Sequence, residues 1–403
     1  MSKIKSVYLL YSVIILISFT FAVRASNNAF MTTLPLFVKD YFNFSQMDIG
    51  ILAGFSSLIT FLTALLINSK INSNARRRLF IFANLLMPVS FLLVVFSNPV
   101  SIWFYVPFVS FASGIIMPNV LTSAGNYEDR KTRERMLGIY ALALSASLIV
   151  GPAIEALALE HFSLKYAFLV FVPISLIALI LSFFMKFPES EAGKSKDIEV
   201  LSNPGFKVAV YSILTYNAPF AMIVFFSGIF AEQVLKLPYD TIMLLFSLLF
   251  AVSFISRALL SYIVPSRLWR YIKFSMLMTI LGLSIIFISR NAIVYAVGII
   301  FLGVPHGLTY PLSISSIGRS FDINKRNKAN SYFFAVIMLI NIGVPTLAGG
   351  LIQAIGFRNV MMLIVPVIIV LFFLARSQVK RINFNRLHQP EQLKIQKPLN
   401  PYP

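Results

Sequence analysis

The 403-residue sequence has no cysteine and few acidic residues, with 15 Asp and Glu against 34 Lys and Arg. The absence of cysteine excludes disulfides, thiolate metal sites and cysteine nucleophiles. Only 12% of the residues are charged, against about 25% in an ordinary soluble domain. This composition argues against a water-soluble globule.

Signatures of catalysis and of ATP hydrolysis are missing as well. The patterns HExxH, GxxxxGK[ST] and G-x-S-x-G do not occur, and no apolar run carries paired carboxylates. A membrane enzyme acting on lipid would need histidines and carboxylates clustered near one interface, and the chain has only three histidines. We therefore expect no enzyme, no cofactor and no metal site.

Long apolar runs are what the sequence does have, and 58% of its residues are hydrophobic. A run of about 20 residues, at ~1.5 Å rise per residue, crosses a hydrocarbon core of about 30 Å. The runs are too long and too unalternating for barrel strands, so they predict helices. We expect an all-α polytopic membrane protein with 12 transmembrane helices, at 7–38, 46–68, 79–97, 102–126, 136–159, 164–185, 206–234, 239–263, 271–289, 292–318, 329–354 and 358–378.

The net charge of +19 could indicate binding to a polyanion, but the positions of the cationic residues favour a different explanation. Most of them fall in alternate loops and at both termini, as the positive-inside rule predicts for cytoplasmic segments. The opposite side holds only Lys39, Lys165, Lys236, Arg290 and Arg358. We therefore expect no nucleic-acid partner, and a plasma-membrane protein with both termini in the cytoplasm.

The chain repeats itself after 193 residues. This shift superposes Gly114, Pro118, Ser123 and Gly125 on Gly307, Pro311, Ser316 and Gly318, and Pro152 on Pro345. Six helices per repeat preserve orientation in the membrane, so the repeats are parallel. They predict two pseudo-symmetric six-helix bundles, 1–187 and 206–379, joined by a cytoplasmic linker at 188–205. The tail, 380–403, is expected to be disordered.

Two motifs resemble those of the major facilitator superfamily of secondary transporters. Arg76, Arg77 and Arg78 match the terminal basic cluster of the family's G-x3-D-R/K-x-G-R/K-R/K loop, whose glycine and aspartate are missing here. Gly151 and Pro152 are similar to part of its antiporter motif, G-x8-G-x3-G-P-x2-G-G, although Glu155 and Ala156 replace the last two glycines. The resemblance covers nearly the whole chain and implies alternating access, with two six-helix bundles rocking about a site near the midplane.

Arg24 lies near the middle of the first predicted span. A charge at the bilayer centre costs about 2.5–3.5 kcal/mol on insertion scales, so it usually faces a partner or a pathway. Helical spacing places Asn27 and Asn28 on the same face as Arg24. These residues could bind an anionic group or a coupling carboxylate. Alternatively, Arg24 is structural and bonds a backbone carbonyl.

His306 lies between Pro305 and Gly307, which we expect to break the helix locally. Its imidazole could carry a coupling proton or bond a substrate, or it could simply bond a neighbouring helix. Tyr310, one turn further on, and Asn217 with its neighbour Tyr216 are expected to line the same site. Asn217 is the repeat equivalent of Arg24, which strengthens both assignments.

Glu155 and Arg257 lie inside predicted spans and not at their ends, and each has two interpretations. Glu155 is either a proton-coupling carboxylate or a hydrated glutamate near the outer face. Arg257 either extends its head to the interface or belongs to the transport path, as the resemblance to efflux members suggests.

The first interpretation of the chain is a secondary active transporter of a small organic solute, as a proton-coupled exporter. An uptake symporter or uniporter of a polar or anionic metabolite, and a non-transporting membrane receptor of the same fold, remain alternatives. The expected partners are a small-molecule substrate, protons and the lipid bilayer, and the expected state is a monomer.

Overall fold

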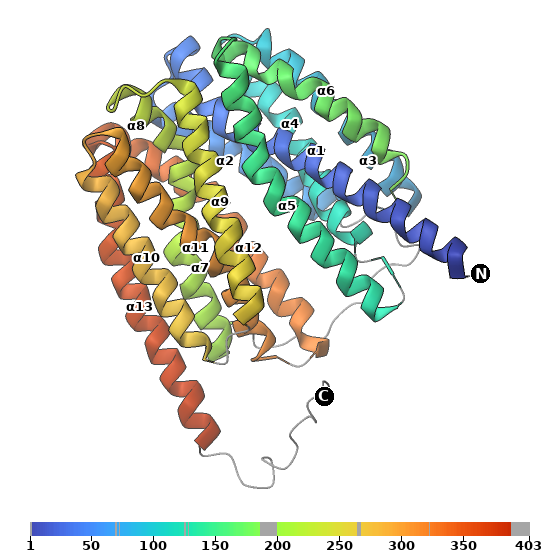
Figure 1. Ribbon diagram of the computed structural model, residues 1–403. Helices are drawn as coiled ribbons and strands as arrows, with labels where there is room; N and C mark the ends of the chain where they lie inside the picture. The colour runs from blue at the N-terminus through green and yellow to red at the C-terminus, as the bar shows by residue number, and fades with distance from the viewer. Residues whose placement is uncertain are drawn as a thin grey trace.

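The computed structural model describes residues 2–68, 71, 73–124, 126–127, 129–185, 200–263, 267–321 and 323–387, and these are almost entirely helical (Figure 1). Twelve of their helices, or continuous helical stretches, are long and apolar enough to cross a membrane, which confirms the predicted number. The first six spans are formed by α1 (Ser2–Phe42), α2 (Gln46–Leu62) with η1 (Thr63–Asn68), α3 (Ser73–Val95), α4 (Ile102–Ala124), α5 (Arg130–Leu159) and α6 (Leu164–Ser182).

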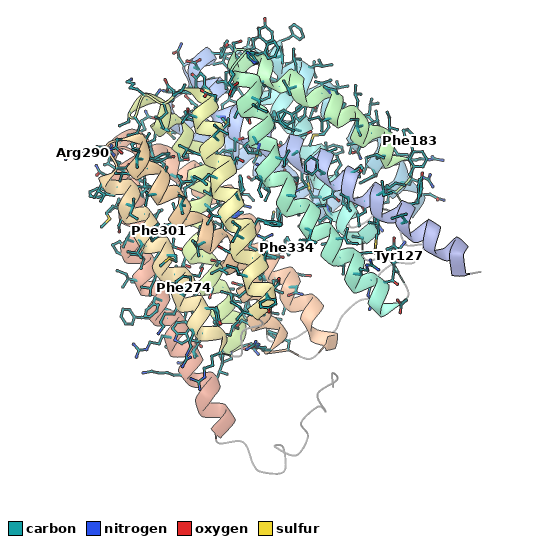
Figure 2. All side chains as sticks on the ribbon, in the orientation of Figure 1. Tyr127, Phe183, Phe274, Arg290, Phe301 and Phe334 are labelled. Atoms are coloured by element: carbon teal, nitrogen blue, oxygen red, sulfur yellow. The ribbon has the colours of Figure 1, made fainter. Side chains whose placement is uncertain are left out.

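The last six spans begin with α7 (Pro204–Met222), which continues through η2 (Ile223–Ser227) into α8 (Gly228–Gln233). They continue with α9 (Tyr239–Ile263), α10 (Leu268–Ile288), α11 (Ala292–Gly318), α12 (Ile323–Ile355) and α13 (Phe357–Leu387). Large apolar side chains cover the outer surface: Phe183 and Phe274 are 50% and 46% exposed (Figure 2). Such a surface is stable against lipid and would be a liability in water.

Helices α1–α6 form one bundle and α7–α13 the other, and the two meet mainly through α2 against α12 and α5 against α9. The bundles approach each other at the end of the molecule away from the chain termini. They diverge toward the end where α1 begins and α13 ends (Figure 1).

The sequence repeat corresponds to equivalent helix contacts in the two bundles. A Cβ atom added to Gly114 of α4 would lie 2.6 Å from the Thr60 carbonyl oxygen of α2. A Cβ added to Gly307 of α11 would clash with the Ser253 carbonyl oxygen of α9. Gly307 and Ser253 are the repeat equivalents of Gly114 and Thr60, since each lies 193 positions later in the sequence. Glycine is therefore needed at both sites because two helix backbones touch there.

The contacts between the two bundles are also related by the shift of 193 residues. Ser247 of α9 donates to the carbonyl oxygen of Ile149 in α5, at 2.8 Å. The equivalent residues are Gly54 of α2 and Ile342 of α12, where an added Cβ would lie 2.7 Å from the carbonyl oxygen. The α2–α12 and α5–α9 contacts are thus related by the pseudo-twofold axis, as the repeat predicts.

Several helices extend further than the apolar runs predicted, on the side of the chain termini. α3 begins at Ser73, α5 at Arg130 and α12 at Ile323. For α5 the reason is a side-chain cap, because the Asp129 carboxylate accepts from the Thr132 backbone N–H at 2.8 Å. A helix can continue beyond the hydrocarbon core, so hydropathy underestimates the length of these helices.

The expected disordered tail is wrong for its first eight residues, since α13 continues to Leu387. Val379 and Ile382 pack against an apolar cluster of α7, α10 and α11, which stabilises these turns. Residues 388–403 of the tail and 188–199 of the expected linker lie outside the described residues. Val200 is buried against α7, α11 and α12.

The expected helix break at His306 is also wrong. α11 runs without interruption from Ala292 to Gly318, with Pro305 and Pro311 inside it. Each proline removes one backbone hydrogen bond, but α9 and α10 pack along α11 and hold it in one piece. Irregular turns occur instead in the π-helical segments η1, which ends the second span, and η2, which interrupts the span of α7 and α8.

Candidate functional site

The polar face of α1 is directed at α4 and α5. The Arg24 Nη1 atom donates to the Met117 Sδ atom of α4 at 3.2 Å, and the Ser113 hydroxyl of α4 donates to Asn27 Oδ1 at 2.8 Å. The Asn28 Nδ2 atom lies 3.5 Å from the Leu148 carbonyl oxygen of α5. Arg24, Asn27 and Asn28 are all half-buried. The face predicted from helical spacing therefore exists as one contact surface.

Gly151 brings α5 against α1. A Cβ at this position would lie 2.9 Å from the Ala25 carbonyl oxygen, beside Arg24. Pro152 follows within the unbroken helix α5. The close approach places the next turn of α5, with Glu155, directly against α1.

Arg257 of α9 crosses between the bundles. Its Nη1 atom donates to the Ser145 hydroxyl of α5 at 2.9 Å. Arg257 and Arg24 lie close enough for their charges to interact, and Tyr140 of α5 lies within the same range of Arg24. Tyr310 of α11 lies within range of both Tyr140 and Arg257. Residues from opposite bundles thus form one cluster of two guanidinium groups and two phenols.

Both guanidinium groups are short of acceptors. Among the described residues, Arg24 donates only to a thioether sulfur, which is a weak acceptor, and Arg257 to one hydroxyl. The Nε atom of each is buried and has no hydrogen-bond partner. Within the described part of the chain, neither arginine pairs with a carboxylate. Since guanidinium offers five donors, the cluster can bind an anion.

His306 is surrounded by aromatic rings. Its Nδ1 atom lies 2.7 Å from the Ser253 hydroxyl oxygen of α9. Its ring centroid lies 4.4 Å from that of Phe220, 5.3 Å from that of Phe250 and 5.7 Å from that of Tyr216. The imidazole is half-buried and lies within electrostatic range of Arg257. The aromatic group therefore adjoins the arginine cluster.

Asn217 does not join this group. Its Nδ2 atom donates to Asn341 Oδ1 of α12 at 3.0 Å. Tyr310 also contacts α12, where its ring centroid lies 6.2 Å from that of Phe333 and 6.4 Å from that of Phe334. Of the residues expected to surround His306, only Tyr216 is in ring contact with it.

Glu155 is fully buried, with 0% exposure, between α5 and α1. The Thr33 hydroxyl donates to its Oε1 atom, and the Thr32 hydroxyl lies 3.4 Å from Oε2. Both hydroxyls have a second acceptor, the Ala29 carbonyl oxygen, at 2.7 Å from Thr33 and 3.0 Å from Thr32. No cation of the described residues pairs with Glu155. Its position is not that of a hydrated outer glutamate.

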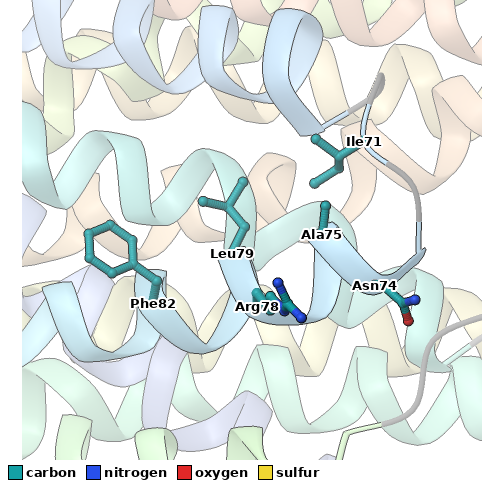
Figure 3. Close-up of a pocket in the computed structure, with 6 residues that line it drawn as sticks. All are labelled: Ile71, Asn74, Ala75, Arg78, Leu79 and Phe82. Carbon is teal, nitrogen blue, oxygen red and sulfur yellow. The ribbon is translucent and has the colours of Figure 1, made fainter.

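The basic cluster expected in a loop lies on the first turns of α3. Arg77 donates to the Phe183 carbonyl oxygen at 3.2 Å, beyond the last turn of α6, and Arg76 to that of Ile71 at 3.3 Å. Arg78 lines a surface cavity of about 550 Å³ with Asn74, Ala75, Leu79, Phe82 and Ile71 (Figure 3). This cavity is lined by α3 and by Ile71, which precedes the helix, and neither Arg24 nor Arg257 lines it.

The sequence interpretation missed the partners of the charged residues. Phe220 is the repeat equivalent of Asn27, and Ser113 is that of His306, so the shift of 193 could have identified both. Nothing in the sequence distinguishes Tyr140 or Ser145 from other residues of their helix. In the described part of the chain, no group of three or more His, Asp or Glu residues could hold a metal ion.

The family model of the Major Facilitator Superfamily matches residues 16–292 and 267–401. The chain belongs to the major facilitator superfamily. It is similar to the solved nucleoside transporter NupG, with a TM-score of 0.74 and 13% identity over 91% of this chain and 99% of that one. The peptide transporter POT gives a TM-score of 0.76 and 11% identity over 92% of this chain and 94% of that one.

The human organic anion transporter MFSD10 (TETRAN) is similar as well, with a TM-score of 0.66 and 12% identity over 91% of this chain and 99% of that one. At these identities the likeness establishes the fold. The family establishes that the chain is a multi-pass membrane transporter and not an enzyme. Members of this superfamily bind small-molecule substrates, some of them together with protons.

Proposed function

We propose that this transporter moves a small anionic solute by alternating access, and that the anion bridges Arg24 and Arg257. The observation that carries the proposal is the pair of under-bonded guanidinium groups, one from each bundle, with no carboxylate partner among the residues described. A charge-assisted, bidentate contact is the strongest interaction that such a pair can offer a small solute.

The placement of Arg24 and Arg257 on opposite bundles explains how anion binding would be linked to movement of the bundles. A solute held by α1 and α9 contacts both bundles, so it stabilises the arrangement in which they close around it. It also neutralises two like charges that repel each other when the site is empty. The proposed carrier is a monomer of the plasma membrane with cytoplasmic termini. Export is its proposed direction.

Glu155 is the proposed proton carrier. The Thr32 and Thr33 hydroxyls can donate either to the carboxylate or to the Ala29 carbonyl oxygen, so either protonation state of Glu155 can be hydrogen-bonded. Glu155 lies on the turn after Gly151, where α5 touches α1 beside Arg24. A change in the hydrogen bonds of Glu155 would therefore alter the contact of α5 with α1, the helix that carries Arg24.

Counterflow of labelled organic anions into proteoliposomes tests the function. Arg24→Ala and Arg257→Ala should each lower kcat/KM by at least about tenfold, because charge-assisted hydrogen bonds are lost. Arg290→Ala is the matched control, since Arg290 is exposed in the turn between α10 and α11 (Figure 2). Unchanged kinetics in both arginine variants would refute the site, and solute binding without exchange would indicate a receptor.

A further inference from the structure

Equivalent positions of the two bundles carry different chemistry. In the first bundle Asn27 and Ser113 are joined by a hydrogen bond of 2.8 Å. The same positions in the second bundle, after the shift of 193, are Phe220 and His306, whose ring centroids lie 4.4 Å apart. One side of the site is therefore polar and cationic, and the other is aromatic.

The aromatic side is enclosed by protein and not by lipid. The span of α7 and α8, which carries Tyr216 and Phe220, is the most enclosed of the 12 spans described: 78% of an 18-residue apolar stretch is buried, against 28–56% in the others. Phe220 and His306 nevertheless keep part of their surface free. Since α7 faces little lipid, this free surface is available to a solute between the bundles.

A buried hydroxyl in the same group has no partner. Tyr216 is 3% exposed, and its hydroxyl oxygen makes no hydrogen bond with any residue that the structure describes. A buried polar atom without a partner is costly and usually marks a ligand or a water. The Tyr216 ring stacks on that of Phe220 at 5.7 Å. A hydrogen-bonding group is thus present beside the aromatic surface.

We infer that the transported anion carries a flat aromatic ring, which packs on Phe220 and His306 while its anionic group binds Arg24 and Arg257. This inference rests on the proposed function and specifies its substrate class. Aromatic rings attract each other at centroid separations of about 4.5–7 Å beyond what their apolar area provides. Arg257 lies near both groups, which matches the short distance between ring and charge in an aryl carboxylate.

The test uses benzoate and cyclohexanecarboxylate, which have the same charge and a similar size but differ in aromaticity. Their dissociation constants are measured by calorimetry on the purified full-length protein, with acetate and neutral benzamide as further probes. Benzoate should bind about three- to tenfold more tightly than cyclohexanecarboxylate. Phe220→Leu should remove most of this preference and leave cyclohexanecarboxylate binding nearly unchanged. Phe274→Leu, on the lipid-facing surface, is the control.

The two proposals fail in different ways. Equal affinity for the two carboxylates, or a preference that Phe220→Leu leaves intact, would overturn the aromatic inference while the anion site stands. Binding of benzamide as tight as that of benzoate, with no loss in Arg24→Ala, would overturn the anion site and with it both proposals. Absence of binding by every carboxylate would have the same meaning. His306→Ala repeats the test should Phe220→Leu not fold.

Discussion

At the scale of single residues, Arg24 and Arg257 share their charge but not their surroundings. Among the residues described, Arg24 donates a hydrogen bond within its own bundle, to Met117. Arg257 already reaches the opposite bundle, through Ser145. A solute that replaces the Ser145 contact would therefore free Arg257 to move with it, whereas Arg24 would stay on α1.

Lysine substitutions separate charge from geometry. Arg24→Lys and Arg257→Lys keep the positive charge but lose the planar fork of donors, so we expect kcat/KM to fall by about threefold, less than in the alanine variants. Counterflow kinetics with a range of anion concentrations would measure this. Full activity in both lysine variants would mean that charge alone suffices and that no bidentate contact forms.

Glu155→Gln tests the proton carrier. The amide has the same shape, and its oxygen can accept from one of the Thr32 and Thr33 hydroxyls while its NH2 group donates to the other, but it cannot take up and release a proton. We expect pH-gradient-driven transport to be lost while exchange of labelled solute at equal pH continues. Thr33→Ser, which keeps the hydroxyl, should retain both activities. Persistence of gradient-driven uptake in Glu155→Gln would assign coupling to another group.

At the scale of helices, the close contact between α2 and α12 depends on glycine. Gly50 and Gly54 of α2 and Gly349 of α12 all face backbone atoms of the other helix. Gly50 and Gly54 lie in the first half of α2, which begins at Gln46. The repeat equivalents of Gly50 and Gly54 in α9 are the larger residues Met243 and Ser247. We therefore expect α5 and α9 to pack less closely than α2 and α12.

Gly54→Leu should keep the α2–α12 end open. Its side chain would collide with Thr346 and with the Ile342 carbonyl oxygen, which an added Cβ would approach to 2.7 Å. We expect transport to be lost but anion binding to persist. Because the chain has no cysteine, a single cysteine at Met47 would report opening through faster alkylation.

Gly350→Leu is the control for this experiment, because nothing lies within 4 Å of its Cβ position on α12. It should leave both transport and the alkylation rate unchanged. If Gly54→Leu transported normally, the glycine contacts would not be part of the closed end.

Apolar run length was enough to predict every span, because lipid leaves the backbone few alternatives to a helix. It missed the first turns of α5, which depend on the Asp129 cap. Arg24 could be found because charges inside a membrane are rare. Composition does not mark Phe220, which is one of 39 phenylalanines, but its repeat relation to Asn27 could have identified it. The repeat located Asn217 but not its partner Asn341, because symmetry relates backbone positions and not side-chain contacts.

At the scale of the whole molecule, two like charges on opposite bundles make the empty carrier different from the loaded one. Rocking of the bundles changes the separation of Arg24 and Arg257, and their repulsion rises as this separation falls. A bound anion removes most of the repulsion. The loaded carrier should therefore reorient faster than the empty one, and the protein should behave as an exchanger.

Two fluxes measured on the same proteoliposomes test this. Efflux of labelled solute into buffer with unlabelled solute should exceed efflux into solute-free buffer by about tenfold, since a barrier difference of roughly 1.4 kcal/mol corresponds to that ratio. Arg257→Gln removes one of the two charges and keeps a hydrogen-bonding side chain, so the ratio should approach one even though affinity falls. A ratio that stays high in Arg257→Gln would show that the repulsion does not hold back the empty carrier, because the charge pair would be gone and the barrier would remain.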